Sequence, residues 1–172
     1  MTGGVRFREA VLSDLDAIVR LLADDALGAE RETPPGAAGG LPEETGAARA
    51  YVAAFEAIER DPNHVLLVGE SAGSVCAVLQ LSFLPHLTYE GGWRAQIEGV
   101  RVAREARGRG VGRALIEEAV TRARVRRCHL VQLTTDRRRP EALAFYRALG
   151  FEATHHGMKL HLRQGRKGGT DG

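Results

Sequence analysis

The feature that most constrains this chain is the stretch from Gln96 to Val120, QIEGVRVAREARGRGVGRALIEEAV. Its centre has a glycine at every second position, 108, 110 and 112, with arginines between and beside them. A strand interior does not hold three such glycines, because each one removes a packing side chain and adds backbone freedom. The pattern predicts a loop followed by a helix, and the helix carries one apolar stripe: Leu115, Ile116, Ala119, Val120 and Ala123.

A glycine-rich loop before a helix is an anion-binding feature, because unpaired N–H groups and the helix dipole both favour negative charge. We expect this anion to be a pyrophosphate. A P-loop would end in Gly-Lys-Ser or Gly-Lys-Thr, but Gly112 is followed by Arg113 and Ala114. A dinucleotide fingerprint would read G-x-G-x-x-G, whereas this segment reads G-x-G-x-G. The sequence therefore excludes both of these nucleotide motifs.

Composition narrows the class of protein further. A chain of 172 residues with 44% hydrophobic and 27% charged residues suits one globular domain with a substantial core. The formal net charge of +2 is small, so a local basic patch for a phosphorylated ligand is favoured over nucleic-acid binding. The sequence has no apolar run of about 18 residues and no apolar segment near its start, so we expect no membrane association and a cytoplasmic protein.

Hydrophobic periodicity predicts the order of the elements along the chain. Val5 and Phe7 alternate with arginines in a first strand, and a helix opens at Ser13. A long loop follows over 28–46, and a second helix over 47–59. Strands over 65–70 and 75–84 should form an antiparallel hairpin. The remaining elements are a loop over 85–93, strands over 96–102, 130–135 and 158–162, and a helix over 141–149 that ends near Gly150.

Two motifs in this order resemble those of the GNAT family of N-acetyltransferases. Arg107 to Gly112 fits the family pattern Gln/Arg-x-x-Gly-x-Gly/Ala, and Ala142 to Phe151 fits a helix that ends in Phe-Tyr-x-x-x-Gly-Phe. The resemblance implies an α/β fold of the acyl-CoA N-acyltransferase type. That fold has a central mixed sheet of about six or seven strands, with about four helices on both faces. We expect one domain over residues 1–162 and a flexible tail over 163–172.

The resemblance also implies acetyl-CoA as the co-substrate. Its pyrophosphate would bind the loop and first helical turn: Arg107, Gly108, Arg109, Gly110, Val111, Gly112 and Arg113. Its pantetheine arm would pair with the backbone of Val100, Arg101 and Val102 as an added strand does. In the family, a bulge in this strand often directs an N–H group at the thioester carbonyl. The alternative is that the loop is a solvated turn that only caps a helix.

Two residues are candidates for proton transfer. Glu98 matches a position where many family members carry a catalytic base. A carboxylate inside an apolar strand would be desolvated, which raises its pKa toward that of a useful base. Tyr146 matches the family's general-acid tyrosine, which protonates the leaving thiolate. The alternatives are that Glu98 points outward and pairs with an arginine, and that Tyr146 is a core aromatic beside Phe145. Arg139 stands where many relatives have an asparagine, so it either contacts a phosphate or belongs to a solvated run over 137–139.

These assignments predict direct transfer of an acetyl group to a primary amine of a small molecule, such as an amino acid, a polyamine or a drug-like amine. The alternatives are a non-catalytic acyl-CoA sensor, a nucleotide-binding regulator, and an acetyltransferase for protein N-termini or lysines. Cys76 and Cys128 lie in apolar runs and are expected to be buried thiols, so an acyl-enzyme is disfavoured. The histidine and cysteine spacing fits no metal site. The resemblance leaves a homodimer open.

Overall fold

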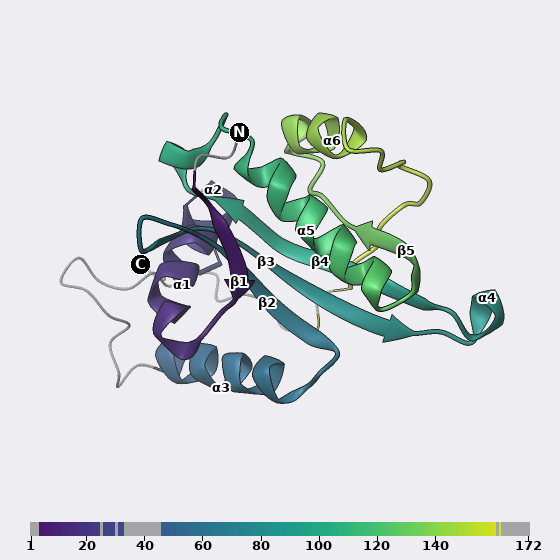
Figure 1. Cartoon of the computed structure of the whole chain (residues 1–172), viewed down its shortest axis with the longest axis horizontal. Helices are drawn as coiled ribbons and strands as arrows, with labels where there is room; N and C mark the ends of the chain where they lie inside the picture. The colour runs from purple at the N-terminus through teal and green to yellow at the C-terminus, as the bar shows by residue number, and fades with distance from the viewer. Residues whose placement is uncertain (1–3, 25, 30, 33–45, 161, 163–172) are drawn as a thin grey trace, which may run out of the picture. The chain divides into compact units, whose positions relative to one another are not determined.

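Five strands form one mixed sheet in a computed structural model of the chain, which describes residues 4–24, 26–29, 31–32, 46–160 and 162. The strands lie side by side in sequence order: β1 (Arg6–Glu9), β2 (His64–Ser71), β3 (Ser74–Pro85), β4 (Trp93–Val102) and β5 (Cys128–Leu133). Neighbours from β1 to β4 are antiparallel, whereas β5 runs parallel to β4 (Figure 1). The predicted α/β class and mixed sheet are confirmed.

The described residues also form six α-helices and two short 3-10 turns. The helices are α1 (Leu15–Ala23), α2 (Ala26–Ala29), α3 (Gly46–Arg60), α4 (Thr88–Gly91), α5 (Val111–Val125) and α6 (Pro140–Arg147). The turns are η1 (Leu12–Asp14) and η2 (Arg104–Ala106). The chain divides into two units, Met1–Leu133 and Thr134–Gly172, and every element except α6 belongs to the first.

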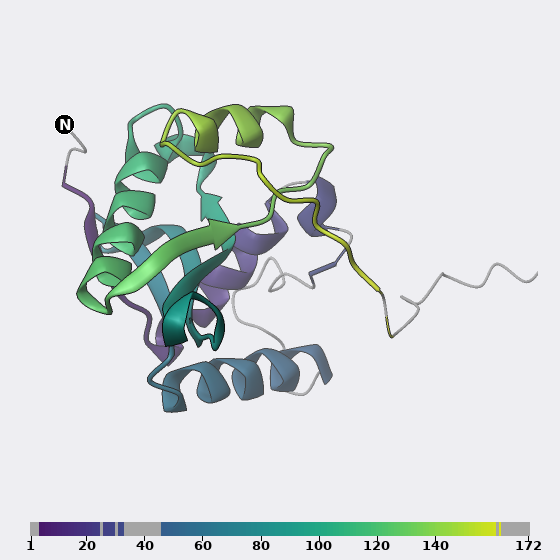
Figure 2. The same ribbon diagram turned by 90° about the vertical axis from the view of Figure 1, so that its right-hand side faces the viewer.

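Helices cover both faces of the sheet in the first unit. Helix α5 crosses one face, and α1 and α3 lie on the other (Figures 1 and 2). The stripe expected on α5 does face the core, because Leu115, Ile116, Ala119 and Ala123 are buried and Val120 is half-buried. On the opposite face, Leu15 and Val19 of α1 pack with Phe55 of α3. This two-sided burial of apolar stripes is what holds the sheet between its helices.

The β2–β3 hairpin is confirmed, with an antiparallel register that runs from His64 opposite Ser82 to Ser71 opposite Ser74. Its turn uses left-handed backbone at Ala72 (φ 49°) and Gly73 (φ 78°). The loop expected over 28–46 begins with the last residues of α2, and most of its length lies outside the described residues.

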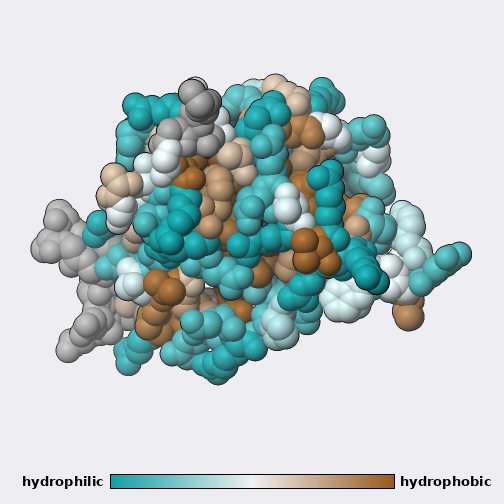
Figure 3. All heavy atoms as spheres, viewed as in Figure 1, coloured by the Kyte–Doolittle hydropathy of each residue, from teal (hydrophilic) through white to brown (hydrophobic). Residues whose placement is uncertain are grey.

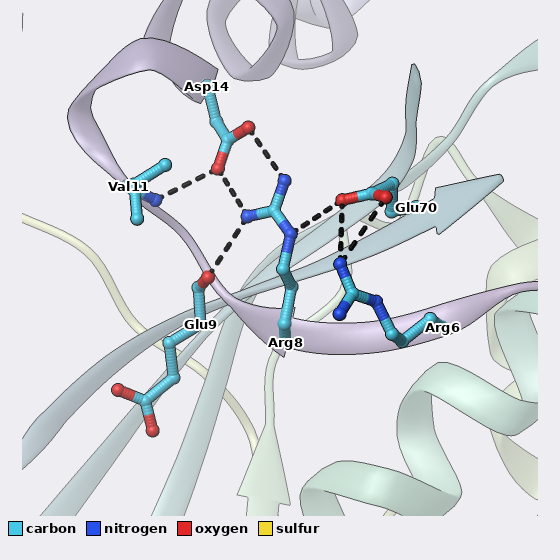
Figure 4. Close-up of polar contacts among 6 residues, drawn as sticks. All are labelled: Arg6, Arg8, Glu9, Val11, Asp14 and Glu70. Atoms are coloured by element: carbon cyan, nitrogen blue, oxygen red, sulfur yellow. Dashed lines mark hydrogen bonds and ion pairs between the residues drawn. The ribbon is translucent and has the colours of Figure 1, made fainter. Parts of the chain in front are cut away.

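An ion-pair network ties β1 to β2 and to the turn before α1 (Figure 4). The guanidinium of Arg8 donates two bonds to the carboxylate of Asp14, at 2.6 and 3.0 Å, and a third to Glu70 at 2.7 Å. Asp14 is buried, and it also accepts a bond of 2.9 Å from the backbone N–H of Val11. A buried carboxylate with these partners fixes the entry into α1.

The second unit contains α6 and a segment without regular structure. Gly150 follows the helix with φ 90°, which confirms the expected left-handed end. The strand expected over 158–162 is wrong for the described residues, because 158–160 are not in a strand and the large side chains there are exposed. Alternating apolar residues form a strand only with a neighbour to pair with, and in the described part of the chain this segment has none. The described sheet therefore has five strands rather than six or seven.

The molecular face seen in Figure 3 is largely hydrophilic, with apolar side chains in small scattered groups. The strongly exposed apolar side chains include Leu87 at 99% and Val125 at 80%. Among the described residues, no helix is long and apolar enough to cross a membrane.

Candidate functional site

The middle of β4 contains a β-bulge at Gly99 and Val100. Glu98 lies opposite Gln80 and Arg101 lies opposite Val78, so two residues of β4 face the single residue between them on β3. Gly99 has φ 63°, a left-handed conformation that glycine adopts without a Cβ clash. A bulge at this place redirects the backbone groups that follow it. The sequence alone does not reveal it, because a bulge depends on register against β3.

Beyond the bulge, β4 continues without its parallel neighbour. The pairing between β4 and β5 ends at Ile97 opposite Leu133, while β4 extends to Val102 (Figure 1). The backbone N–H of Ala103 donates to Cys76 of β3 at 2.8 Å. Because successive residues alternate in direction, Val102 then directs its backbone groups away from β3, toward the open edge. This open edge over residues 98–102 is where an extended ligand arm can add as a strand.

The glycine-rich loop connects this open edge to the N-terminus of α5. Gly108 (φ 73°) and Gly110 (φ 80°) are both left-handed, and Gly110 is the N-cap of the helix. Among the described residues, no side chain caps α5, which leaves its first N–H groups for solvent or a ligand. A 15-residue helix with an uncapped N-terminus is a favourable place for a phosphate. The loop and the first turn of α5 are therefore a candidate anion site.

The arginines of the loop differ in their partners. Arg107 donates through Nε to the carbonyl of Val102 at 2.9 Å and through Nη2 to Asp24 at 3.0 Å. Asp24 also pairs with Arg104, at 3.1 Å. Arg109 is exposed and forms no ion pair within the described residues, and Arg113 has only a distant pairing with Glu117 at 3.7 Å. Arg109 and Arg113 therefore keep their charge for a ligand, whereas the charge of Arg107 is balanced by Asp24.

Glu98 directly precedes the bulge, but its expected burial is wrong. The side chain is exposed, because it lies on the polar side of β4, one residue beyond the point where the pairing with β5 ends. It also forms no ion pair within the described residues. Desolvation by an apolar strand is therefore not what would make Glu98 a base. Its place beside the open edge is what keeps it a candidate.

The sequence interpretation missed a row of polar side chains that leads along β4 to Glu98. Arg94, Gln96 and Glu98 alternate with the buried Ala95 and Ile97, so they share one face of the strand. On β5, Gln132 lies opposite Gln96 and donates from Nε2 to its Oε1 at 2.6 Å. The signal was present in the sequence as the alternation R-A-Q-I-E.

Tyr146 and Arg139 belong to the second unit. Tyr146 lies on α6, is half-buried, and has its ring 5.2 Å from that of Phe145 and 5.8 Å from that of Phe151. Arg139 is half-buried at the N-cap of α6. In the run over 137–139, Arg138 folds back on Asp136 with bonds of 3.0 and 3.1 Å. These bonds hold the pKa of Asp136 well below its usual range. Arg138 is therefore already paired with a neighbouring carboxylate.

Both cysteines were expected to be buried thiols, which is confirmed for Cys76, whereas Cys128 is only half-buried. Burial raises the pKa of both thiols, which disfavours the nucleophilic thiolate. Among the described residues, no group of three or more histidine, cysteine, aspartate or glutamate side chains is placed to hold a metal ion.

Comparisons with known proteins bear on the family and the fold. The model of a family described as "Acetyltransferase (GNAT) family" matches residues 29–151. A transcriptional regulator from Bacillus halodurans is similar in structure, with a TM-score of 0.83 and 46% identity over 91% of this chain and 99% of that one. A putative acetyltransferase from Agrobacterium tumefaciens has a TM-score of 0.76 and 27% identity, again over 91% and 99%.

A predicted acetyltransferase from Clostridium acetobutylicum, solved with acetyl-CoA, has a TM-score of 0.69 and 19% identity over 92% of this chain and 96% of that one. At this identity the likeness shows the fold alone. Among curated proteins, none matches the chain.

Proposed function

Because this chain belongs to the acetyltransferase (GNAT) family, we propose that it transfers the acetyl group of acetyl-CoA directly to a primary amine of a small molecule. The observation that carries the proposal is a continuous run of three features. The bulge at Gly99, the open edge of β4 and the uncapped N-terminus of α5 follow one another between residues 98 and 113. The fold neighbour solved with acetyl-CoA supports this choice of co-substrate.

Each feature has a role in this proposal. The N–H groups of the first turn of α5, with Arg109 and Arg113, bind the pyrophosphate. Within the segment Val100, Arg101 and Val102, the backbone groups that point away from β3, among them the N–H of Val102, pair with the amides of the pantetheine arm. An N–H group at the bulge polarises the thioester carbonyl and stabilises the oxyanion that forms on it. Arg139 remains a second proposed phosphate contact, by resemblance.

Proton transfer completes the reaction. Glu98 accepts a proton from the acceptor ammonium, directly or through water, so that the neutral amine attacks the thioester carbon. The C–N bond forms, the C–S bond breaks, and Tyr146 protonates the departing thiolate. The nitrogen then loses its second proton, which returns to the tyrosinate directly or through water. Both roles rest on motif position in the family. Direct transfer is favoured over an acyl-enzyme because burial raises the pKa of both cysteine thiols.

Thermal unfolding with acetyl-CoA, CoA, ATP and NAD tests the binding part of the proposal. A ligand that binds only the folded protein raises the Tm by mass action. We expect a shift with acetyl-CoA and CoA alone, and we expect Gly110→Glu to abolish it because a carboxylate would occupy the phosphate position. Ala53→Glu, on the exposed side of α3, is the charge-matched control and should keep the shift. No shift with either CoA species would rule out the proposal, and an equal shift with ATP would favour a nucleotide-binding regulator.

A second candidate is an acyl-CoA sensor without turnover. The relative that is 46% identical is described as a transcriptional regulator, which favours keeping this alternative. A sensor and an acetyltransferase would both bind acetyl-CoA. Only the acetyltransferase would convert it to free CoA faster when an acceptor amine is present. A screen of amino acids, polyamines and lysine peptides with thiol detection separates them, and it also tests the protein-acetyltransferase alternative. Cytoplasmic location and a homodimer remain predictions.

A further inference from the structure

The connection between β3 and β4, which contains the single turn α4, is built from unusual backbone. Tyr89 (φ 55°), Glu90 (φ 56°) and Gly91 (φ 79°) are three consecutive left-handed residues, and two of them are not glycine. Such residues cost free energy and persist only where the surroundings hold them. Here the backbone N–H of His86 donates to the carbonyl of Gly92 at 3.0 Å and closes the loop. The result places His86 and Tyr89 next to the start of β5.

His129 of β5 is redirected toward the same loop. Trp93 pairs with Cys128 and Arg94 pairs with Leu130, so His129 is an extra residue in a parallel bulge. Its ring lies 4.4 Å from the ring of Tyr89 and 6.3 Å from that of His86. A Cβ at Gly92 would come within 2.8 Å of Nδ1 of His129, so the glycine makes room for this ring.

Three basic side chains thereby gather at one end of β4: His86, Arg94 and His129. Burial lowers the pKa of His86, and the nearby positive charges of Arg94 and His129 lower it further. Within the described residues, none of the three forms an ion pair with a carboxylate. The Nε of Arg94 is also buried without a hydrogen-bond partner. A buried guanidinium nitrogen without an acceptor is costly, and an anion would satisfy it.

We propose that His86, Arg94 and His129 form a binding site for a carboxylate or phosphate group, and that this group belongs to the amine acceptor. The second part rests on the proposed function. Arg94 and Glu98 share one face of β4 and are four residues apart, so their Cα atoms are on the order of 13 Å apart. The amide pair of Gln96 and Gln132 lies between them. An acceptor that fits this row is elongated, with its amine near Glu98, polar groups in the middle and an anion at Arg94.

Binding of the anion is tested by NMR of the histidine rings in the full chain, titrated with inorganic phosphate and, separately, with acetate. We expect saturable shifts at His86 and His129, and affinities that are about 10-fold or more weaker in Arg94→Gln. His129→Gln, at an exposed position, is a second variant with less risk to folding and should weaken binding severalfold. Arg124→Gln removes an exposed arginine of α5 and should bind like the wild type. Shifts that do not saturate, or that are equal in Arg94→Gln, would overturn the site.

The link to the acceptor is tested with tetraglycine and its C-terminal amide, which differ only in the terminal anion and span a similar length. We expect the wild type to acetylate tetraglycine with a kcat/KM about 10-fold above that of the amide, and Arg94→Gln to remove the difference. Equal rates for both peptides in the wild type would overturn the assignment to the acceptor while the acetyltransferase function stands. Saturable phosphate binding that requires Arg94, with neither peptide acetylated, would keep the anion site but remove its assignment to the acceptor.

Discussion

Arg107 and Asp24 are 83 residues apart in sequence, and Nη2 of Arg107 donates to the carboxylate of Asp24 at 3.0 Å. Through Nε, the same guanidinium holds the carbonyl of Val102 at the open edge of β4. Arg107 thus connects the end of α1, the end of β4 and the glycine-rich loop. Its role is therefore more structural than that of Arg109, whose charge has no partner in the described part of the chain.

This difference predicts opposite effects for two neighbouring arginines. Arg107→Gln should lower the free energy of unfolding by about 1 kcal/mol, because it removes an ion pair and a bond to a backbone carbonyl. Arg109→Gln should leave stability within about 0.5 kcal/mol but weaken acetyl-CoA binding severalfold. Urea unfolding and calorimetric titration of both variants provide the two measurements. If Arg107→Gln reduced affinity more than Arg109→Gln at unchanged stability, the assignment would be reversed.

The bulge in β4 predicts that Gly99 tolerates no side chain. An alanine there would have to adopt φ near 63°, which costs about 1 to 2 kcal/mol, or the bulge would relax and turn its N–H away. We expect Gly99→Ala to lower both the stability and the kcat of acetyl transfer. Gly46→Ala is the matched control, because an added Cβ meets nothing within 4 Å and no left-handed backbone is required. Full kcat in Gly99→Ala would show that the bulge does not position the thioester.

The sequence predicts those features of the fold that depend on residues close together in the chain. The stripe on α5, the β2–β3 hairpin and the left-handed Gly150 are set by residues close together in the chain, and all three are confirmed. The strand expected at 158–162 failed because alternation alone does not supply a partner strand. The burial expected at Glu98 failed for a related reason. It depends on where β5 ends, and β5 pairs with β4 only as far as Leu133.

Long-range pairings were also out of reach of the sequence interpretation. Nothing local links Arg107 to Asp24, or marks His129 as an extra residue opposite β4. The sequence shows Arg94, Gln96 and Glu98 as alternating polar residues. Only the structure shows that Gln132 on β5 pairs with Gln96 in the middle of this row. The glycine-rich loop and the helix after it could be predicted from the sequence, because the glycines and the helix are adjacent in the chain.

Glu98 and Tyr146 are predicted to act on rate rather than on co-substrate binding. Glu98→Gln should lower kcat by about 100-fold, because an amide does not accept the proton of the amine, and the KM for acetyl-CoA should stay nearly constant. Tyr146→Phe should lower kcat by about 10-fold or more. Glu59→Gln, an exposed carboxylate on α3, is the control and should leave kcat unchanged. A variant of Glu98 with full kcat at every pH tested would remove it from the mechanism.

The network around Arg8 predicts how stability depends on pH (Figure 4). Hydrogen bonds from Arg8 hold the pKa values of Asp14 and of Glu70 below their ordinary values. The unfolded chain therefore takes up protons first, near pH 4 for ordinary carboxylates, and about that pH stability begins to fall. The contribution is fully present above this pH and is lost as the pH drops through the lower pKa values of the folded protein. Urea unfolding between pH 7 and pH 3 measures this loss.

Asp14→Asn isolates the contribution of the buried member of the network. At pH 7 the variant should be less stable by about 1 to 3 kcal/mol, because Arg8 loses a charged, bidentate partner in a buried position. At pH 3 the wild-type carboxylate is closer to its own protonation, so the difference between the two proteins should shrink. Glu59→Gln, which removes an exposed carboxylate of α3, is the matched control and should change stability little. A destabilisation by Asp14→Asn of equal size at both pH values would mean that Asp14 contributes through packing and neutral hydrogen bonds rather than through its charge.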